Sequence, residues 1–484
     1  MFALLLFWPL ACSPPEVVTI AGRSGAVEVR LVNPTTCSTC DPFETVDTLR
    51  IDVLRHGAVV ASDSFRYPEE DPVLPGLDEY GVVRIQLVGL SAGVVVSAGR
   101  SDEVSVDPEG TLSVPIVFLP VNRDVPVTAK MASHRSNHVA LRLRNGTVLI
   151  AGGASVKRDA AFATTEVYDP ASGTFSAGPG ELPGKVAEPR VVVLPEGDTM
   201  FIGGYAIGAD TSTSASTAVS VFSEEAGTIT ATGSLAQPRA GHCVSLFRSR
   251  QGIVFGGNTD TNQADFFRSD AVGAAFTFSG VPMQNLVQGN VTGCVALADG
   301  RTFVQGSDAA STGIWNYTEE TAGQIDPGNA FEPINPGAPK ARFVAGEIVV
   351  PLAEGSAWIA GGADTTTGEV LSVGREFRPD SAAFADAAGL ARPAYGAKWT
   401  PWMDAGLIAV GCGWQDTART IPTGGIELLD PLGVEVGVTI ALDRGRNGCS
   451  ITTLNDGSLL IAGGFTDGEK NSIDAALVIP WIED

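Results

Sequence analysis

The sequence predicts an all-β fold made of repeated hairpin units, and three observations support this prediction. Glycine accounts for 57 of the 484 residues and proline for 30, which is typical of chains with tight turns between short strands. Two apolar runs separated by a glycine turn recur along most of the chain, as in HVALRLRNGTVLIAGG from His138 to Gly153. The turn is Asn-Gly or Asp-Gly in several copies, which is the chemistry that a two-residue hairpin with positive φ requires.

The repeat has a period of roughly fifty residues, and its second apolar run ends in a glycine pair or a remnant of one. These endings are Gly152-Gly153, Gly203-Gly204, Gly256-Gly257, Gln305-Gly306, Gly361-Gly362, Gly411-Cys412-Gly413 and Gly463-Gly464. A third run and a short fourth run follow, so each repeat carries four antiparallel strands, which is the content of one β-propeller blade. The sequence therefore predicts a seven-bladed propeller over residues 121–484. A six-bladed ring without the weak fourth copy is the alternative.

The first copy carries the fullest version of a pattern that resembles the kelch repeat. Its matching residues are Arg135, His138, Gly152, Gly153, Glu166, Val167, Tyr168, Asp169, Pro170 and Gly173. The resemblance covers about residues 120 to 484 and implies a kelch-like propeller. The chain departs from the kelch pattern in the fourth strand, where Phe175 stands in the place of the usual tryptophan.

The way in which the ring closes can also be predicted. The seventh repeat ends at its third strand, DAALVIPWIED, and lacks residues for a fourth. We expect the segment from Val125 to Lys130, which precedes the first blade, to supply that strand. Such a pairing joins the two ends of the propeller and removes two exposed sheet edges.

The first residues predict export and lipid anchoring. Residues 1–11 contain the run MFALLLFWPL, which is too short for a membrane-spanning helix of about 20 residues and fits a secretion signal. Leu10-Ala11-Cys12 resembles the lipobox of bacterial lipoproteins, which implies lipidation of Cys12, for example with palmitate, and Ser13 resembles those sent to the outer membrane. We expect a surface lipoprotein of a Gram-negative bacterium that touches the membrane only through this lipid. The alternative is a plain export signal cleaved elsewhere.

Residues 12–120 contain several alternating runs, among them AVEVRLV and GVVRIQLVGL, with turn signals between them. This spacing predicts a small β-sandwich, broadly immunoglobulin-like or transthyretin-like, that acts as a spacer before the propeller.

The six cysteines other than Cys12 are disulfide candidates, because an exported protein meets an oxidising compartment. The three predicted pairs are Cys37 with Cys40 in one loop, Cys243 with Cys294 between the third and fourth blades, and Cys412 with Cys449 between the sixth and seventh. The alternative for the last four is that they remain buried free thiols.

Charge and motif content limit the function classes. The chain has 31 basic and 55 acidic residues, a net charge of −24, which repels nucleic acid. Some kelch-like propellers are copper-radical oxidases, but only four histidines are present, and His138 and His242 share one repeat position that indicates a structural role. The sequence has neither GxSxG nor HExxH. We therefore expect no catalysis and no cofactor, with a propeller oxidase as the remote alternative.

We expect a protein or glycan partner to bind the face that carries the long connections, because variable loops on a rigid scaffold commonly hold binding sites. The candidate residues on that face are Tyr205, Trp414, Asp260, Asp364, Asp416 and Asp467. The aspartates predict a cationic partner or one bridged by Ca²⁺, while the alternative is that they only cap turns. A structural envelope component without a dissociable ligand is the other alternative.

Overall fold

The computed structural model describes residues 17–18, 26–70, 81–106, 111–155, 157–248, 250–257, 263–282, 291–297, 299–306, 312–315, 331–334, 344–352, 355–364, 366–402, 406–418, 420–433, 437–466 and 475–481. The regular structure within these ranges is all β, in sheets that are antiparallel except where β2 pairs with β8. Over the same ranges, no helix is long and apolar enough to cross a membrane.

The described residues up to Pro120 form two sheets around one apolar core. Their strands are β1 (Val17–Val18), β2 (Ala26–Val32), β3 (Thr48–Arg55), β4 (Ala58–Arg66), β5 (Gly81–Ser91), β6 (Val94–Arg100), β7 (Val104–Val106), β8 (Thr111–Val117) and β9 (Leu119–Pro120). The smaller sheet has the order β1-β2-β8, and the larger has the order β4-β3-β5-β6-β9 with β7 paired to β5. Val29 and Ile116 of the smaller sheet pack with Ile51, Ile85 and Leu87 of the larger, so alternate residues of each strand fill the space between them.

Further along the described chain, seven sheets of four or five strands follow one another, and we number them I to VII. Sheets I to III contain β12 (Val139–Arg142), β13 (Val148–Ala151), β15 (Thr164–Asp169) and β16 (Thr174–Glu181); β17 (Arg190–Val193), β18 (Thr199–Ile202), β19 (Tyr205–Ile207), β20 (Thr213–Ser223) and β21 (Thr228–Arg239); and β22 (His242–Arg248), β23 (Gln251–Gly256), β24 (Gln263–Arg268) and β25 (Thr277–Pro282). A separate two-stranded sheet joins β11 (Arg135–Ser136) to β14 (Ala154–Ser155).

The remaining sheets continue the same order. Sheets IV to VII contain β26 (Val291–Ala296), β27 (Thr302–Gly306), β28 (Gly313–Trp315) and β29 (Phe331–Pro333); β30 (Val344–Pro351), β31 (Ala357–Asp364), β32 (Gly374–Arg378) and β33 (Ala383–Ala387); β34 (Lys398–Trp402), β35 (Leu407–Gly411), β36 (Thr423–Leu429) and β37 (Thr439–Arg446); and β38 (Ser450–Thr453), β39 (Leu459–Ala462), β40 (Ala476–Val478) and β10 (Asp124–Pro126).

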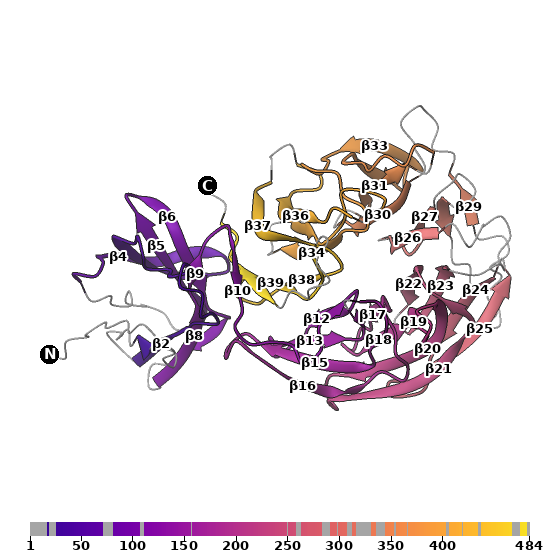
Figure 1. Ribbon diagram of the computed structural model, residues 1–484, viewed down its shortest axis with the longest axis horizontal. Helices are drawn as coiled ribbons and strands as arrows, with labels where there is room; N and C mark the ends of the chain where they lie inside the picture. The colour runs from indigo at the N-terminus through magenta and orange to yellow at the C-terminus, as the bar shows by residue number, and fades with distance from the viewer. Residues whose placement is uncertain are drawn as a thin grey trace.

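The seven sheets are arranged around a ring, with the first strand of each sheet nearest the centre (Figure 1). Consecutive first strands contact one another at β38 and β12, β17 and β22, β22 and β26, β26 and β30, and β34 and β38. Radial four-stranded antiparallel sheets in this arrangement are consistent with a β-propeller.

The expected pairing of the two ends of the ring is confirmed. Strand β10 pairs antiparallel with β40, so that Asp124 lies opposite Val478 and Pro126 opposite Ala476. The strand is shorter than the sequence suggested, because the chain leaves the sheet after Val127. The amide of Thr128 donates to Pro34 O at 2.8 Å and no longer to the neighbouring strand.

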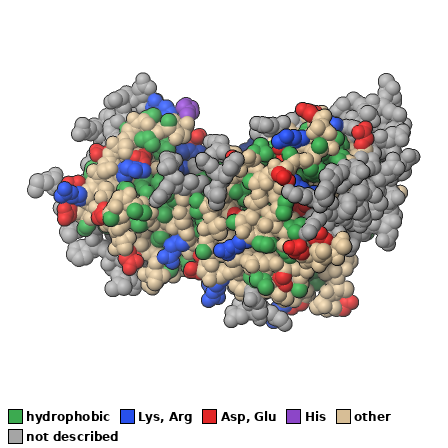
Figure 2. Space-filling model, turned by 90° about the horizontal axis from the view of Figure 1, so that it is seen from above, with side chains coloured by type: hydrophobic (Ala, Val, Ile, Leu, Met, Phe, Trp, Pro, Cys, Tyr) green, Lys and Arg blue, Asp and Glu red, His purple; other side chains and the backbone are tan. Residues whose placement is uncertain are grey.

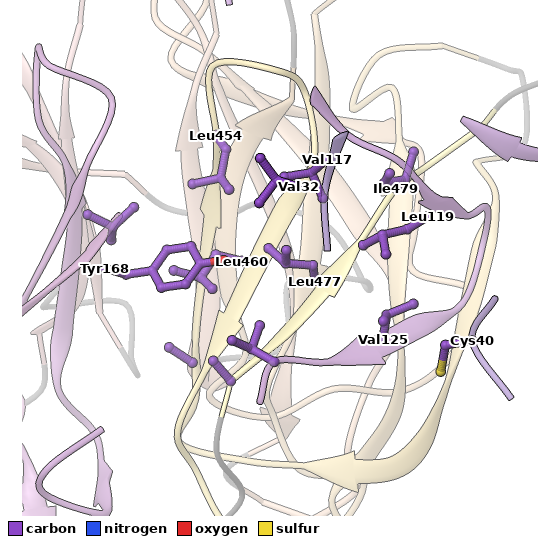
Figure 3. Packing of buried hydrophobic residues seen from close by; sticks show 14 of the residues in the cluster. Val32, Cys40, Val117, Leu119, Val125, Tyr168, Leu454, Leu460, Leu477 and Ile479 are labelled. Carbon is purple, nitrogen blue, oxygen red and sulfur yellow. The ribbon is translucent and has the colours of Figure 1, made fainter. Parts of the chain in front are cut away.

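The N-terminal part and sheet VII share one apolar core. Val32, Val117 and Leu119 from the N-terminal strands are buried with Leu460 and Leu477 of sheet VII (Figure 3). This shared burial fixes the N-terminal part to sheet VII, where the ring closes, because separating the parts exposes those side chains to water.

Candidate functional site

In two places a buried ion pair ties the chain just before the first strand of a sheet to the third strand of that sheet. Arg135 donates from Nη2 to Glu166 Oε1 at 2.6 Å in sheet I, and from Nη1 to Gly152 O at 2.7 Å. Arg239 donates from Nε to Asp265 Oδ2 at 2.6 Å in sheet III. All four charged side chains are almost fully buried, so these pairs are internal to the sheets and leave no group for a ligand.

Sheets II and VI lack this arginine, and a small cavity lies at the corresponding place in each. Val186 lines the cavity in sheet II, and Ala394 and Glu427 line the one in sheet VI. Each cavity has a volume of about 10 Å³, which is room for about one water molecule. Neither cavity therefore serves as a pocket for an organic ligand.

The two repeat histidines are held in their neutral form. His138 is buried and forms a 2.9 Å hydrogen bond between Nε2 and Ser450 Oγ of sheet VII. Burial, with the charges of Arg135 and Lys398 nearby, lowers the pKa of His138 to about 3. Burial also lowers the pKa of His242 well below its ordinary value. Within the described ranges, no three His, Cys, Asp or Glu side chains gather as a metal-ligand group.

A chain of backbone hydrogen bonds links the inner ends of sheets VI, VII, I and II. Gly448 N donates to Cys412 O at 3.1 Å, Asn137 N to Gly448 O at 2.7 Å, and Glu188 N to Asn137 O at 2.7 Å. Asn137 and Glu188 have positive φ angles of 54° and 52°. The corresponding residues of sheets III, V, VI and VII, which have positive φ as well, are Gly241, Gly346, Gly396 and Gly448. Positive φ is unfavourable for glutamate, so the fold holds Glu188 in a strained position beside the ring axis.

Two cations occupy the same repeat position on the inner strands of sheets II and VI. Arg190 is the first residue of β17 and pairs with Ile202, and Lys398 is the first residue of β34 and pairs with Gly411. Ile202 and Gly411 each lie directly before the positive-φ ending of the second strand. Because inner strands begin at the end where the long connections enter, both cations lie on that side of the ring. We call Glu188, Arg190 and Lys398 the axial cluster.

The charges of the axial cluster act on one another. Burial lowers the pKa of Lys398, while Glu188 raises it and Arg190 lowers it further. Burial also lowers the pKa of Arg190, which Glu188 and Tyr205 raise. Arg190 nevertheless has an exposed side chain. A guanidinium that touches water yet is surrounded by protein atoms fits a position at the axis of the ring, and its Nε donates to His242 O at 2.7 Å.

Sequence reasoning missed the axial cluster. A signal was present, because Arg190 and Lys398 interrupt the first position of the inner strands. The residues that occupy this position in sheets I, III, V and VII are Val139, Cys243, Ile348 and Ser450. A charged residue at a repeat position that is otherwise uncharged predicts a binding site better than the aspartates in the loops do.

The aromatic candidates differ in how much of each side chain is exposed. Trp414 is buried, with 8% of its surface exposed, and packs edge-on against Phe465 with the ring centroids 5.6 Å apart. Tyr205 is half-buried, and its hydroxyl lies close to Gly241 of the next sheet. Arg158 lies over the Phe465 ring at 5.3 Å from the centroid. Trp414 therefore orders its loop, whereas Tyr205 keeps part of its ring at the surface near the axis.

The described candidate aspartates cap turns in their own loops. Asp416 accepts hydrogen bonds from Thr420 N and Ile421 N, each at 2.8 Å, and bonds from Thr420 lower its pKa. Asp364 accepts from Thr366 N at 2.8 Å and Thr367 N at 2.9 Å. This is the Asx-turn geometry that the sequence left open as the alternative role. Asp260, Asp467 and the lipidation candidate Cys12 lie outside the described residues.

The six other cysteines are brought together in the three expected pairs. Cys37 and Cys40 join with their Cα atoms 5.3 Å apart. Two further disulfides connect neighbouring sheets: Cys243 with Cys294 at a Cα separation of 5.7 Å, and Cys412 with Cys449 at 5.3 Å. Both separations lie within the range that a disulfide allows.

The N-terminal part lies against the face of the ring that carries the short turns, which join strands one to two and three to four of each sheet. Arg84 donates to Asn455 O, and Asn455 Nδ2 donates to Asp102 Oδ2 at 3.2 Å, at the first turn of sheet VII. Arg30 Nη2 donates to Ala171 O at 3.2 Å, at the last turn of sheet I. These contacts cover the short-turn face at sheets I and VII.

Charged side chains of both signs lie on the surface seen from above. Figure 2 shows basic, acidic and hydrophobic side chains interspersed among the described residues in this view.

Comparison with known proteins identifies no family for this chain. No family model matches it, and no curated protein matches it. A solved structure described as "Structure of YjhT" aligns over 72% of this chain and 96% of that chain, with 14% sequence identity and a TM-score of 0.43.

Proposed function

We propose that this protein is a non-catalytic cell-surface lipoprotein that recognises a protein or glycan partner through the face of its ring with the long connections. In this proposal residues 1–11 are the signal peptide, residues 12–120 form a β-sandwich spacer, and residues 121–484 form a kelch-like propeller with seven blades. The partner lies outside the cell or in the envelope, and only the lipid on Cys12 enters the outer membrane.

The described sheets support this architecture. Sheets I to VII correspond to the seven repeats, and the weak fourth repeat forms the four strands of sheet IV, which favours seven blades over six. The two N-terminal sheets enclose one core, which is the arrangement of a sandwich.

One observation carries the choice of face. The N-terminal part contacts the short turns of sheets I and VII through Arg30, Arg84 and Asp102. Because the lipid precedes that part in the chain, the anchored protein turns its covered face toward the membrane side and its long connections away from it. A partner that approaches the cell therefore meets the axial cluster and the long connections first.

The test is a glycan array together with proximity labelling on intact cells, with the anchored protein as the source of label. The proposal expects a defined glycan or envelope protein to be captured by the wild type. Capture should be lost when the long connection of sheet VI is shortened between Trp414 and Pro422. If neither assay yields a partner while the protein remains folded at the surface, a purely structural envelope role replaces recognition.

A further inference from the structure

We propose that Arg190 and Lys398 form a subsite at the ring axis for the carboxylate of an acidic sugar. This inference rests on the proposed function, because both residues lie on the side of the ring with the long connections. It names the chemistry by which that face selects its partner.

The first support is position. Arg190 and Lys398 hold the same register on β17 and β34, the innermost strands of sheets II and VI. The inner ends of these two sheets are connected through sheets VII and I by the backbone chain that runs from Cys412 to Glu188. Two equivalent cations are therefore placed around one axis on a rigid frame, which keeps the entropy cost of binding low.

The second support is that the charged groups are available. Among the described residues, none accepts a hydrogen bond from Arg190 Nη1 or Nη2 or from Lys398 Nζ, and none donates to the carboxylate of Glu188. The other arginines near the axis differ, because Arg135 and Arg239 are bound to buried carboxylates. Arg190 uses only Nε, toward His242 O, and this bond orients its guanidinium.

The third support is the charge balance. Arg190 and Lys398 provide two positive charges against the one carboxylate of Glu188, and His138 beside them is neutral because burial lowers its pKa. One positive charge is thus left in a partly desolvated place, where a single carboxylate gains charge-assisted hydrogen bonds. Glu188 disfavours an anion with two charges and can accept hydrogen bonds from hydroxyl groups.

The surroundings favour a sugar over an acidic peptide side chain. The half-buried ring of Tyr205 lies near Arg190, because the titrations of the two side chains are coupled. An aromatic ring beside charged groups suits a sugar, whose ring offers C–H groups for stacking and hydroxyls for Glu188. A carboxylate on a flexible peptide side chain makes no use of either feature.

The test compares D-glucuronate with D-glucose, which differ at one carbon that bears a carboxylate or a hydroxymethyl group. Ligand-observed NMR and calorimetry on the purified full chain should show saturable glucuronate binding and glucose binding at least about tenfold weaker. Lys398→Met should weaken the binding of glucuronate by about tenfold. Folding should not change, because Lys398 Nζ has no hydrogen-bond partner among the described residues. Arg142→Met is the matched control, since Arg142 lies at the other end of an inner strand and bonds Thr453 O.

Three results overturn the subsite: equal binding of glucose and glucuronate, a Lys398→Met variant that binds like the wild type, or tighter binding of N-acetylglutamate amide than of glucuronate, which indicates an acidic peptide. Arg190→Lys, which keeps the charge, should retain more affinity than Arg190→Met. If the purified chain does not bind glucuronate while intact cells still capture a partner through the long connections, the subsite is wrong and the proposed function stands. If capture depends on the short-turn face, the proposed function is wrong.

Discussion

The guanidinium of Arg239 and the carboxylate of Asp265 form a 2.6 Å ion pair in which neither side chain has any exposed surface. The pair joins the end of β21, the last strand of sheet II, to the third strand of sheet III. Asp265 also accepts a hydrogen bond from Ala236 N, so one carboxylate holds both the backbone and a side chain at the end of β21.

Asp265→Asn should lower the free energy of unfolding by about 3–5 kcal/mol, because it leaves the charge of Arg239 buried without a counter-ion. Chemical denaturation monitored by tryptophan fluorescence measures this loss. Asp299→Asn is the control: Asp299 and Arg301 form an exposed pair on a turn, and its loss should cost less than about 1 kcal/mol. Equal effects of the two substitutions contradict the structural role of the buried pair.

The disulfide between Cys243 and Cys294 should contribute more stability than the one between Cys37 and Cys40. The first closes a segment with a sequence separation of 51 and joins two sheets, whereas the second has a separation of 3 within one loop. Because loop-closure entropy grows with length, replacing the first pair by alanine should cost about 3–4 kcal/mol. Thermal unfolding of the two double-alanine variants, without reductant, compares the two disulfides. A larger loss of stability in the variant without Cys37 and Cys40 contradicts the prediction.

Stability should fall in acid partly because of His138. Burial holds the pKa of His138 at about 3 in the folded chain, while an unfolded histidine has its ordinary value of 6.5. Between these values the unfolded state binds more protons, so stability decreases as the pH falls below 6.5, by about 2–3 kcal/mol at pH 4.5. His138→Gln should flatten the dependence of unfolding free energy on pH between 6.5 and 4.5. The exposed His56 provides the control His56→Gln, which should leave the slope as in the wild type.

The sequence was sufficient to predict those features of the fold that arise from local backbone chemistry. The Asn145-Gly146 and Asp456-Gly457 turns and the glycine pairs each determine a hairpin by their own backbone preferences, so the repeat and its strands could be predicted. The closing strand was predictable because the repeat pattern expects four strands in each sheet and the seventh copy shows three of them. The point at which this strand ends could not be predicted, because it depends on the hydrogen bond from Thr128 N to Pro34 O in another part of the chain.

The candidate site was harder to predict because it depends on contacts between distant repeats. Glu188 and Lys398 are far apart in the sequence and are brought near the axis only by the ring. Trp414, a candidate for the binding face, is buried, since its partner Phe465 belongs to the next repeat. The contact of Arg84 with Asn455, which covers one face, likewise joins segments that no local pattern connects.

Cys12→Ser should release the protein from membranes. In the proposed lipoprotein the acyl chains on Cys12 hold the protein at the membrane, so a variant that cannot be acylated there should lose this attachment. Fractionation of cells and metabolic labelling with a fatty acid measure the outcome, and Cys37→Ser with Cys40→Ser serves as the control for loss of cysteine alone. Continued labelling of the Cys12→Ser variant shows that lipidation occurs elsewhere or that another anchor exists.

The two faces of the ring can be compared with a matched pair of aspartates in sheet VI. Asp416 caps a turn in the long connection by accepting from Thr420 N and Ile421 N, and Asp430 caps a short turn by accepting from Leu432 N at 2.9 Å. Both residues are half-buried turn caps, so Asp416→Ala and Asp430→Ala should each cost about 1 kcal/mol or less of stability. Only Asp416→Ala should reduce partner capture on intact cells, because it loosens a loop on the binding face. The opposite pattern, with capture lost in Asp430→Ala and kept in Asp416→Ala, places the partner on the short-turn face.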